Sequence, residues 1–156
     1  YFYEEGLLIV KEMMDILCLE LVSKNMITDS IGLYIGYSHG YNVPSSRGTA
    51  KIETRTNADF MMIRAVADLY KRIVRKDCPI RRIGISCNNV VEDNGVRQLS
   101  LFDYCPDDLE RAYNLQTAIV SLKTRFGKNS VLKGMNYDKA GTTRERNQQI
   151  GGHKSG

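Results

Sequence analysis

The sequence predicts an α+β fold: a small, mostly antiparallel sheet with helices packed on one face, then a C-terminal helix and a flexible tail. Two kinds of pattern predict it. Segments with apolar residues every three or four positions alternate with segments in which every second residue is apolar. Two of the alternating segments are joined by a loop, as in an antiparallel hairpin. The 156 residues are 42% hydrophobic and 26% charged, which suits one globular domain.

Three segments are predicted to be helical. Residues 4–24 carry an apolar stripe at spacings of three and four, and two glutamates in the first turn suit the helix dipole. The second helix follows Asn57, a suitable N-cap, and runs to about residue 76. The third begins at Pro106, which suits the first helical position, and ends before Gly127, which suits the C′ position.

Three strands are predicted, at residues 31–38, 49–56 and 80–91, with a loop at 39–48. Residues 92–97 read as a polar turn, and residues 130–135 are a further candidate for a short strand. The remaining chain is polar and glycine-bearing, which predicts a flexible basic tail. The predicted organisation is a domain at 1–96, a linker at 97–103, a helix and short strand at 104–135, and the tail at 136–156.

Several classes of protein are excluded by composition. No run approaches about 18 apolar residues, so no membrane-spanning helix is expected, and there is no signal peptide. Four widely spaced cysteines and two histidines do not form a zinc pattern, so we expect reduced cysteines in a cytoplasmic protein and no metal site. Because the chain starts without Met in a helical pattern, we expect it to be a piece of a longer protein.

The net charge of +4 is unevenly distributed. Residues 1–30 hold two basic and six acidic residues, whereas residues 31–92 hold ten basic and five acidic ones. The positive charge therefore lies beyond the first helix, which favours a polyanion bound to one face.

The outward-facing residues of the predicted sheet form the first candidate site. Strand glycines allow another backbone to come close, and arginine, amide and hydroxyl groups donate to phosphate oxygens without reading base sequence. An ordinary solvated face is the alternative interpretation. The candidate residues are Gly32, Gly36, Ser38, Arg82, Gly84, Ser86 and Asn88, with Arg81 and the loop residue Arg47 beside them.

The second candidate site is the pentapeptide Gln98-Leu99-Ser100-Leu101-Phe102. It lies between predicted elements and offers apolar anchors together with a glutamine that can donate and accept hydrogen bonds. Such groups in a linker indicate either docking to a partner or packing against the chain's own core. The chemistry alone does not decide between these two uses.

These motifs carry a resemblance to a known family. QLSLF closely resembles the sliding-clamp binding pentapeptide of bacteria, and IRRIGIS at 80–86 resembles a strand of the C-terminal little-finger domain of Y-family translesion DNA polymerases. Arg125-Phe126-Gly127 and the tail RERNQQIGGHKSG are similar to the end of the DNA polymerase IV/V (ImpB/MucB/SamB-like) group in Gram-positive bacteria. The resemblance spans nearly the whole chain.

The resemblance implies a fold and partners. It implies a four-stranded sheet with two helices on one face, whose other face grips the phosphates of primer–template DNA. Arg81 and Arg82 would contact DNA, with Ser46-Arg47 a weaker match. The pentapeptide would enter a hydrophobic cleft of the sliding clamp during damage bypass in the SOS response. The parent would be a nucleotidyltransferase that uses Mg²⁺, whereas this piece lacks the palm domain, so we expect it to hold no cofactor and to catalyse nothing.

Two further expectations accompany this resemblance. The family's first strand is absent here or reduced to residues 1–3, so residues 130–135 or a second molecule, through strand exchange or a dimer, should cover the open sheet edge. The competing interpretation is an RNA-binding or protein-interaction domain unrelated to polymerases. Exposed aromatic residues such as Tyr34 would favour that interpretation, because single-strand readers stack bases on them.

Overall fold

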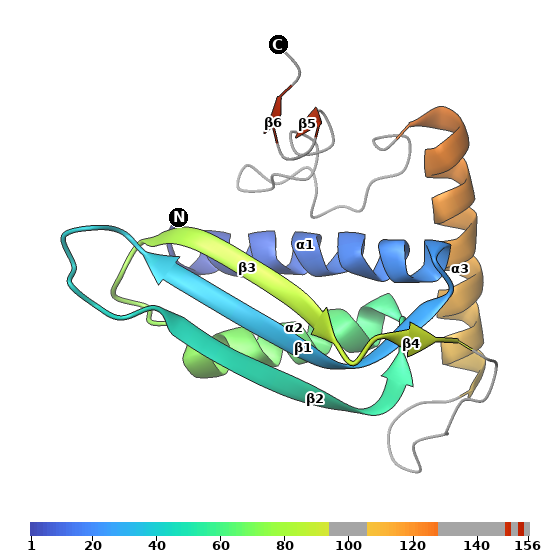
Figure 1. The fold of residues 1–156 in the computed structure, drawn as a ribbon, viewed down its shortest axis with the longest axis horizontal. Helices are drawn as coiled ribbons and strands as arrows, with labels where there is room; N and C mark the ends of the chain where they lie inside the picture. The colour runs from blue at the N-terminus through green and yellow to red at the C-terminus, as the bar shows by residue number, and fades with distance from the viewer. Residues whose placement is uncertain (94–105, 128–148, 151–152, 155–156) are drawn as a thin grey trace.

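The computed structural model of the 156-residue chain describes residues 1–93, 106–127, 149–150 and 153–154, and it confirms the predicted α+β fold (Figure 1). No helix in these ranges is long and apolar enough to cross a membrane. The elements in chain order are α1 (Tyr3–Ser23), β1 (Met26–Tyr37), β2 (Ser46–Thr56), α2 (Asp59–Ile73), β3 (Ile80–Asn88), β4 (Val91–Glu92), α3 (Pro106–Phe126), β5 (Gln149–Ile150) and β6 (His153–Lys154).

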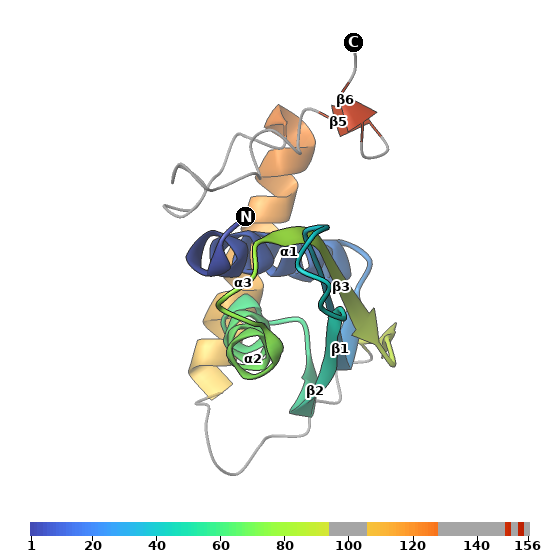
Figure 2. The same ribbon diagram turned by 90° about the vertical axis from the view of Figure 1, so that its left-hand side faces the viewer.

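The sheet is built around β1. Strand β2 pairs antiparallel with one side of β1, and β3 and β4 pair antiparallel with its other side. Figure 2 shows α1 and α2 together on one face of this sheet, while its other face is left open. Helix α3 packs against α1 and touches α2, on the helical side of the molecule.

The core lies between the sheet and the two helices, as the alternating pattern predicts. Ile31, Leu33 and Ile35 of β1 are buried, and their neighbours Gly32, Tyr34 and Gly36 are only partly buried. In the amphipathic helices, the apolar stripes supply the opposite wall of the core. The helix residues that are completely buried in this core are Val10, Met14 and Cys18 of α1 and Met62, Val66 and Tyr70 of α2.

A glycine lets α1 approach α2 closely. A Cβ atom on Gly6 would lie 2.5 Å from the hydroxyl of Tyr70 and 2.7 Å from a side-chain carbon of Ile80. That hydroxyl donates a 2.7 Å hydrogen bond to the carbonyl of Tyr3, and burial raises the pKa of Tyr70. Glycine is unfavourable inside helices in general, so its use here reflects the space that this packing needs.

Two strands begin earlier in the chain than the sequence predicts. Strand β1 begins at Met26 rather than at residue 31, because Met26 and Ile27 pair with β4. The alternation of burial breaks at residues 28–30, where the register between β1 and β2 shifts, and this break concealed the start of the strand. Strand β2 begins at Ser46 rather than at residue 49.

The predicted third strand is split in two. Asn89 adopts a left-handed backbone with a φ of 54°, and the chain resumes pairing with β1 at Val91. Beyond β4, the N–H of Asp93 donates to the carbonyl of Asn25 over 2.9 Å. Residues 94–105 therefore start at the end of this ladder, and α3 begins where they end.

The prediction that Asn57 caps the second helix was wrong. The N-cap is Ala58, and the amide of Asn57 instead donates to the carbonyl of Met26 over 3.1 Å. The fully buried Gln116 of α3 supplies the missing acceptor, since its Oε1 accepts from the N–H of Asp59 over 3.0 Å. Its Nε2 donates to the carbonyl of Asn57 over 2.7 Å, so both ends of this amide are satisfied.

The two ends of the chain test the expectations about the missing first strand and the flexible tail. The terminal amine and the C=O group of Tyr1 both bond to Ile80, at 2.7 and 2.6 Å, so Tyr1 pairs with the start of β3. The proposed cover at residues 130–135 lies outside the described residues, as does most of the predicted tail. Within that tail, β5 and β6 form a two-residue antiparallel ladder. Gly127 has a φ of 102° and bonds to the carbonyl of Lys123, as a C′ residue should.

We predict that Gln116→Ala lowers the free energy of unfolding by about 1–3 kcal/mol, because it removes the bond to the buried carbonyl of Asn57 and the bond from the part-buried N–H of Asp59. Urea unfolding followed by circular dichroism measures this change. Thr117→Ala, at the exposed neighbouring position, is the control and should have a much smaller effect. An unchanged unfolding midpoint for Gln116→Ala would contradict the assigned capping role.

Candidate nucleic-acid interface

The open face of the sheet brings the predicted residues of three strands into rows. Across the ladders, Arg47 lies opposite Tyr34, and Tyr34 lies opposite Gly84. The next row contains Thr49, Gly32 and Ser86. Asn88 lies one row further along β3, opposite Ser30, and Arg82 lies opposite Gly36 at the other end. The two-residue period of the strands therefore gathers residues from three segments on one surface.

A β-bulge explains how neighbouring arginines can both reach solvent. Gly36 pairs with Arg82 but Tyr37 pairs with Ile80, so Arg81 is an extra residue on β3. In a regular strand the two arginines would point to opposite faces, yet both are exposed while Ile80 is buried. A guanidinium nitrogen of Arg81 donates to Nε2 of His39, in the loop after β1.

Two glycines of β1 leave positions of the open face without a projecting side chain. A Cβ atom on Gly32 would lie 2.6 Å from the hydroxyl of Ser86, and one on Gly36 would lie 3.2 Å from Cβ of Arg82. Any larger residue would push these groups away from the sheet. Glycine here allows β3 side chains to lie close to the β1 backbone, and allows a ligand to approach that backbone.

An arginine lies over the aromatic ring at the centre of the face. The guanidinium carbon of Arg47 is 5.1 Å from the ring centroid of Tyr34, within range of a cation–π interaction. Beside this pair is an open depression of about 580 Å³. Its lining includes Gly32, Tyr34, Arg47, Thr49, Gly84 and Ser86. The depression therefore combines a fixed cation with small polar and glycine residues.

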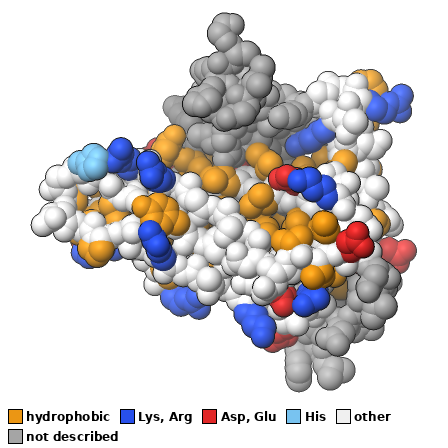
Figure 3. All heavy atoms as spheres, viewed as in Figure 1, with side chains coloured by type: hydrophobic (Ala, Val, Ile, Leu, Met, Phe, Trp, Pro, Cys, Tyr) orange, Lys and Arg blue, Asp and Glu red, His pale blue; other side chains and the backbone are white. Residues whose placement is uncertain are grey.

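The charge of this face has one sign over most of its length. Residues 31–37, 46–51 and 80–88 contain four basic residues and no aspartate or glutamate. In Figure 3, the histidine and a group of blue side chains lie toward the left-hand end of the face, whereas most red side chains lie in its right-hand half, with other blue ones among them. One of the basic residues outside the acid-free part, Arg55, is 3.8 Å from Asp29. The four basic residues of the acid-free part are Arg47, Lys51, Arg81 and Arg82.

The predicted site residues do not all share this face. Ser46 lies opposite the inward residue Ile35, and its hydroxyl is 2.7 Å from that of Tyr37, so it belongs to the inner side of the sheet. Ser38 follows β1, where its N–H donates to the carbonyl of Pro79. The pentapeptide, Gln98 to Phe102, lies outside the described residues.

Three residues of this surface were absent from the predicted site. Lys51 extends the row of cations along β2, and the alternation of that strand already placed it outward. Tyr34 was considered only as a base-stacking residue, whereas it carries Arg47 over its ring. The contact of His39 with Arg81 follows from the loop geometry and had no signal in the sequence.

The described residues offer little for other chemistry. Among them, no group of three histidine, cysteine or acidic side chains could hold a metal ion. Burial raises the pKa of the Cys87 thiol, which disfavours the thiolate that a cysteine nucleophile would need.

Comparisons with known proteins agree with this geometry. Residues 3–101 match the model of the impB/mucB/samB family C-terminal domain. A Bacillus subtilis protein named "Putative UV-damage repair protein UvrX" is 27% identical over 84% of this chain. DNA polymerase IV of Pelotomaculum thermopropionicum is 38% identical over 44% of the chain, and DNA polymerase IV 2 of Halalkalibacterium halodurans is 28% identical over 66%.

These matches cover only part of each relative. The aligned regions are 30%, 16% and 24% of the lengths of the three relatives. No solved structure gives a significant match. Because the family model matches well over half of the residues in the chain, the protein belongs to the impB/mucB/samB family and contains its C-terminal domain.

Proposed function

We propose that this chain holds primer–template DNA by its sugar–phosphate backbone, without base specificity, for a translesion DNA polymerase in damage bypass and repair. The observation that carries the proposal is the part of the open face formed by residues 31–37, 46–51 and 80–88, which holds four basic residues and no acidic one. Nucleic acid is the common ligand that presents a long, regular array of negative charge to such a surface. The family membership supports the same ligand.

The side chains of this face favour phosphate contacts over base reading. Arginine and lysine together with serine, threonine and asparagine are the usual donors to phosphate and sugar oxygens. From the strand register, Arg47 and Arg82 are separated by two strand spacings and one two-residue step, or about 12 Å between Cα atoms. Cations so far apart reach different phosphates, so the contact should extend over several nucleotides.

The RNA-binding alternative receives less support. Single-strand readers present aromatic rings to which bases can stack. Among the described strand residues of the open face, Tyr34 is the one aromatic side chain, and the guanidinium of Arg47 already lies over its ring. A stacked base would have to displace that guanidinium.

We further propose that the pentapeptide of residues 98–102 tethers the parent protein to the sliding clamp. Its resemblance to the clamp-binding motif supports this role, and so does its place in the chain between the end of the β4 ladder and the start of α3. Nucleotidyl transfer, with the Mg²⁺ that the parent is expected to use, is assigned to the remaining length of the parent protein, since this chain corresponds to 30% or less of its relatives.

We predict that Arg82→Ala and Arg47→Ala each weaken binding to duplex DNA by a similar factor for unrelated sequences. Each lost phosphate contact should also flatten the slope of log K against log salt concentration by about 0.9. Fluorescence anisotropy with two labelled duplexes of equal length and different sequence, titrated at several salt concentrations, measures both effects.

Arg64→Ala is the matched control for these two variants. It removes the same charge from an exposed position on α2, on the covered side of the sheet, and should leave the salt slope nearly unchanged. Equal losses in all three variants would mean that net charge alone governs binding. Unchanged affinity of Arg82→Ala at every salt concentration would remove Arg82 from the contact surface.

We predict that replacing Leu101 and Phe102 by alanine abolishes binding to the purified sliding clamp and leaves duplex affinity intact, because the two apolar anchors are lost while the sheet face is unchanged. Surface plasmon resonance with immobilised clamp, beside the anisotropy assay, separates the two activities. Clamp affinity that survives the double substitution would show that this pentapeptide is not the tether.

A further inference from the structure

Helix α3 presents an exposed apolar stripe that neither the sheet face nor the family match explains. Leu115 is 59% exposed, Leu122 is 40% exposed and Phe126 is 67% exposed. They are seven and four residues apart, which places them on one side of the helix over three turns. The family model ends at residue 101, before this helix begins.

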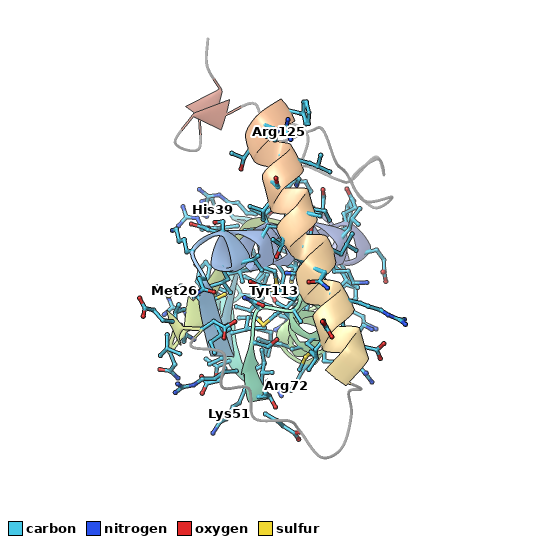
Figure 4. The ribbon with its side chains drawn as sticks, turned by 90° about the vertical axis from the view of Figure 1, so that its right-hand side faces the viewer. Met26, His39, Lys51, Arg72, Tyr113 and Arg125 are labelled. Carbon is cyan, nitrogen blue, oxygen red and sulfur yellow. The ribbon has the colours of Figure 1, made fainter. Side chains whose placement is uncertain are left out.

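The face of α3 that adjoins the stripe already packs against the domain. Gln116 and Ile119 are buried, Ile119 on the same line of the helix as Leu115 and Leu122. Leu109 and Ala112 pack against the core formed by α1 and α2. The exposed stripe is thus additional to the residues that dock the helix. Figure 4 shows α3 crossing the helical side of the molecule, with its Arg125 end extending past α1.

The charges around the stripe are of one sign. Residues 111–126 contain three basic residues, Arg111, Lys123 and Arg125, and no acidic residue. The guanidinium of Arg125 lies 5.4 Å from the ring centroid of Phe126. A long apolar line on a helix with cations at its borders fits a hydrophobic groove that has carboxylates on its rim.

A second copy of the chain is a poor occupant. Three side chains with these exposed fractions present on the order of 300 Å². A stable interface of standard size buries about 800 Å² on each partner. Pairing two such helices would also bring basic borders together. The stripe is therefore more suited to a small additional contact with a protein that is already held nearby.

We propose that this stripe, Leu115, Leu122 and Phe126 with Arg111 and Arg125, is a second contact of the chain with the sliding clamp. The inference rests on the proposed tether: residue 102 precedes Pro106 by four residues, or at most about 14 Å of extended chain. Along α3, Leu115 then lies about 14 Å and Phe126 about 30 Å beyond Pro106. A large protein that holds the pentapeptide is positioned to meet the stripe, and the two contacts then reinforce each other through a high effective concentration.

The test compares clamp binding of four forms of the chain by surface plasmon resonance with purified, immobilised clamp. The first form is the unsubstituted chain. The stripe variant carries Leu115→Ser with Phe126→Ser, and the pentapeptide variant carries Leu101→Ala with Phe102→Ala. The control carries Asn114→Ser with Thr124→Ser, at exposed positions of α3 outside the stripe. We expect the stripe variant to bind about tenfold more weakly than the unsubstituted chain, equivalent to about 1.4 kcal/mol, and the control to bind like the unsubstituted chain.

Other outcomes would overturn the inference in distinguishable ways. If the stripe variant binds like the unsubstituted chain while the pentapeptide variant does not bind, the second contact is rejected and the proposed tether is kept. If no form binds the clamp, or the pentapeptide variant keeps full affinity, the tether itself fails. A dimer in sedimentation velocity that the stripe variant loses would assign the stripe to a second copy. A large fall in melting temperature of the stripe variant, but not of the control, would assign it to the chain's own packing.

Discussion

The two-residue period of β1 is the constraint on which the rest of the structure depends. Every other strand of the main sheet pairs with this one strand, so its alternation sets the faces of all of them. Ile31, Leu33 and Ile35 direct the core toward the helices, and the residues between them are consequently outward. A slip of one residue would bury the glycines and Tyr34 and expose the isoleucines, so the apolar core fixes the register of the binding face as well.

The sequence predicts this arrangement well where the signal is local and regular. Alternation in β1 and β2 placed the inward and outward residues correctly, and helical periodicity placed all three long helices. It fails where a local break or a distant partner decides the conformation. The left-handed Asn89 divides the third strand, and the extra residue Arg81 alters which side chains reach solvent. Neither feature has a clear signature in one sequence.

The start of α2 shows the effect of a distant partner. Asparagine is a common N-cap residue, but the side-chain amide of Asn57 donates its hydrogen bond to the carbonyl of Met26. The cap comes from Gln116, nearly sixty residues later in the chain, where periodicity indicates only that the position lies on a helix. Ser46 is a similar case, because its neighbour Arg47 is on the open face while Ser46 itself bonds to Tyr37 on the inner side. Adjacent residues of a regular strand point to opposite faces, so only one of the two can belong to the open face.

The geometry separates the two proposed activities. The open sheet face and α3 lie on different sides of the molecule, as Figures 2 and 4 show. DNA on the sheet would not cover the exposed stripe of α3, so one copy of the chain could hold both partners at once. The charge is positive on both surfaces, but the sheet face is rich in glycine and small polar residues, whereas α3 presents large apolar groups. This difference suits a sugar–phosphate backbone on one side and a protein surface on the other.

The docking of α3 through Gln116 has a mechanical consequence. Asp93, whose N–H bonds to the carbonyl of Asn25, and α3, which Gln116 bonds to the start of α2, are both held by the folded domain. On the proposed clamp binding, tension on the chain between them would act on the end of a β-ladder and on a helix held by buried side chains. Dissociation of α3 would also remove the bonds of Gln116 to the start of α2, so it would disturb the core. On the proposed function, a clamp bound between Asp93 and α3 would therefore pull on two elements of the folded domain and not on a trailing end.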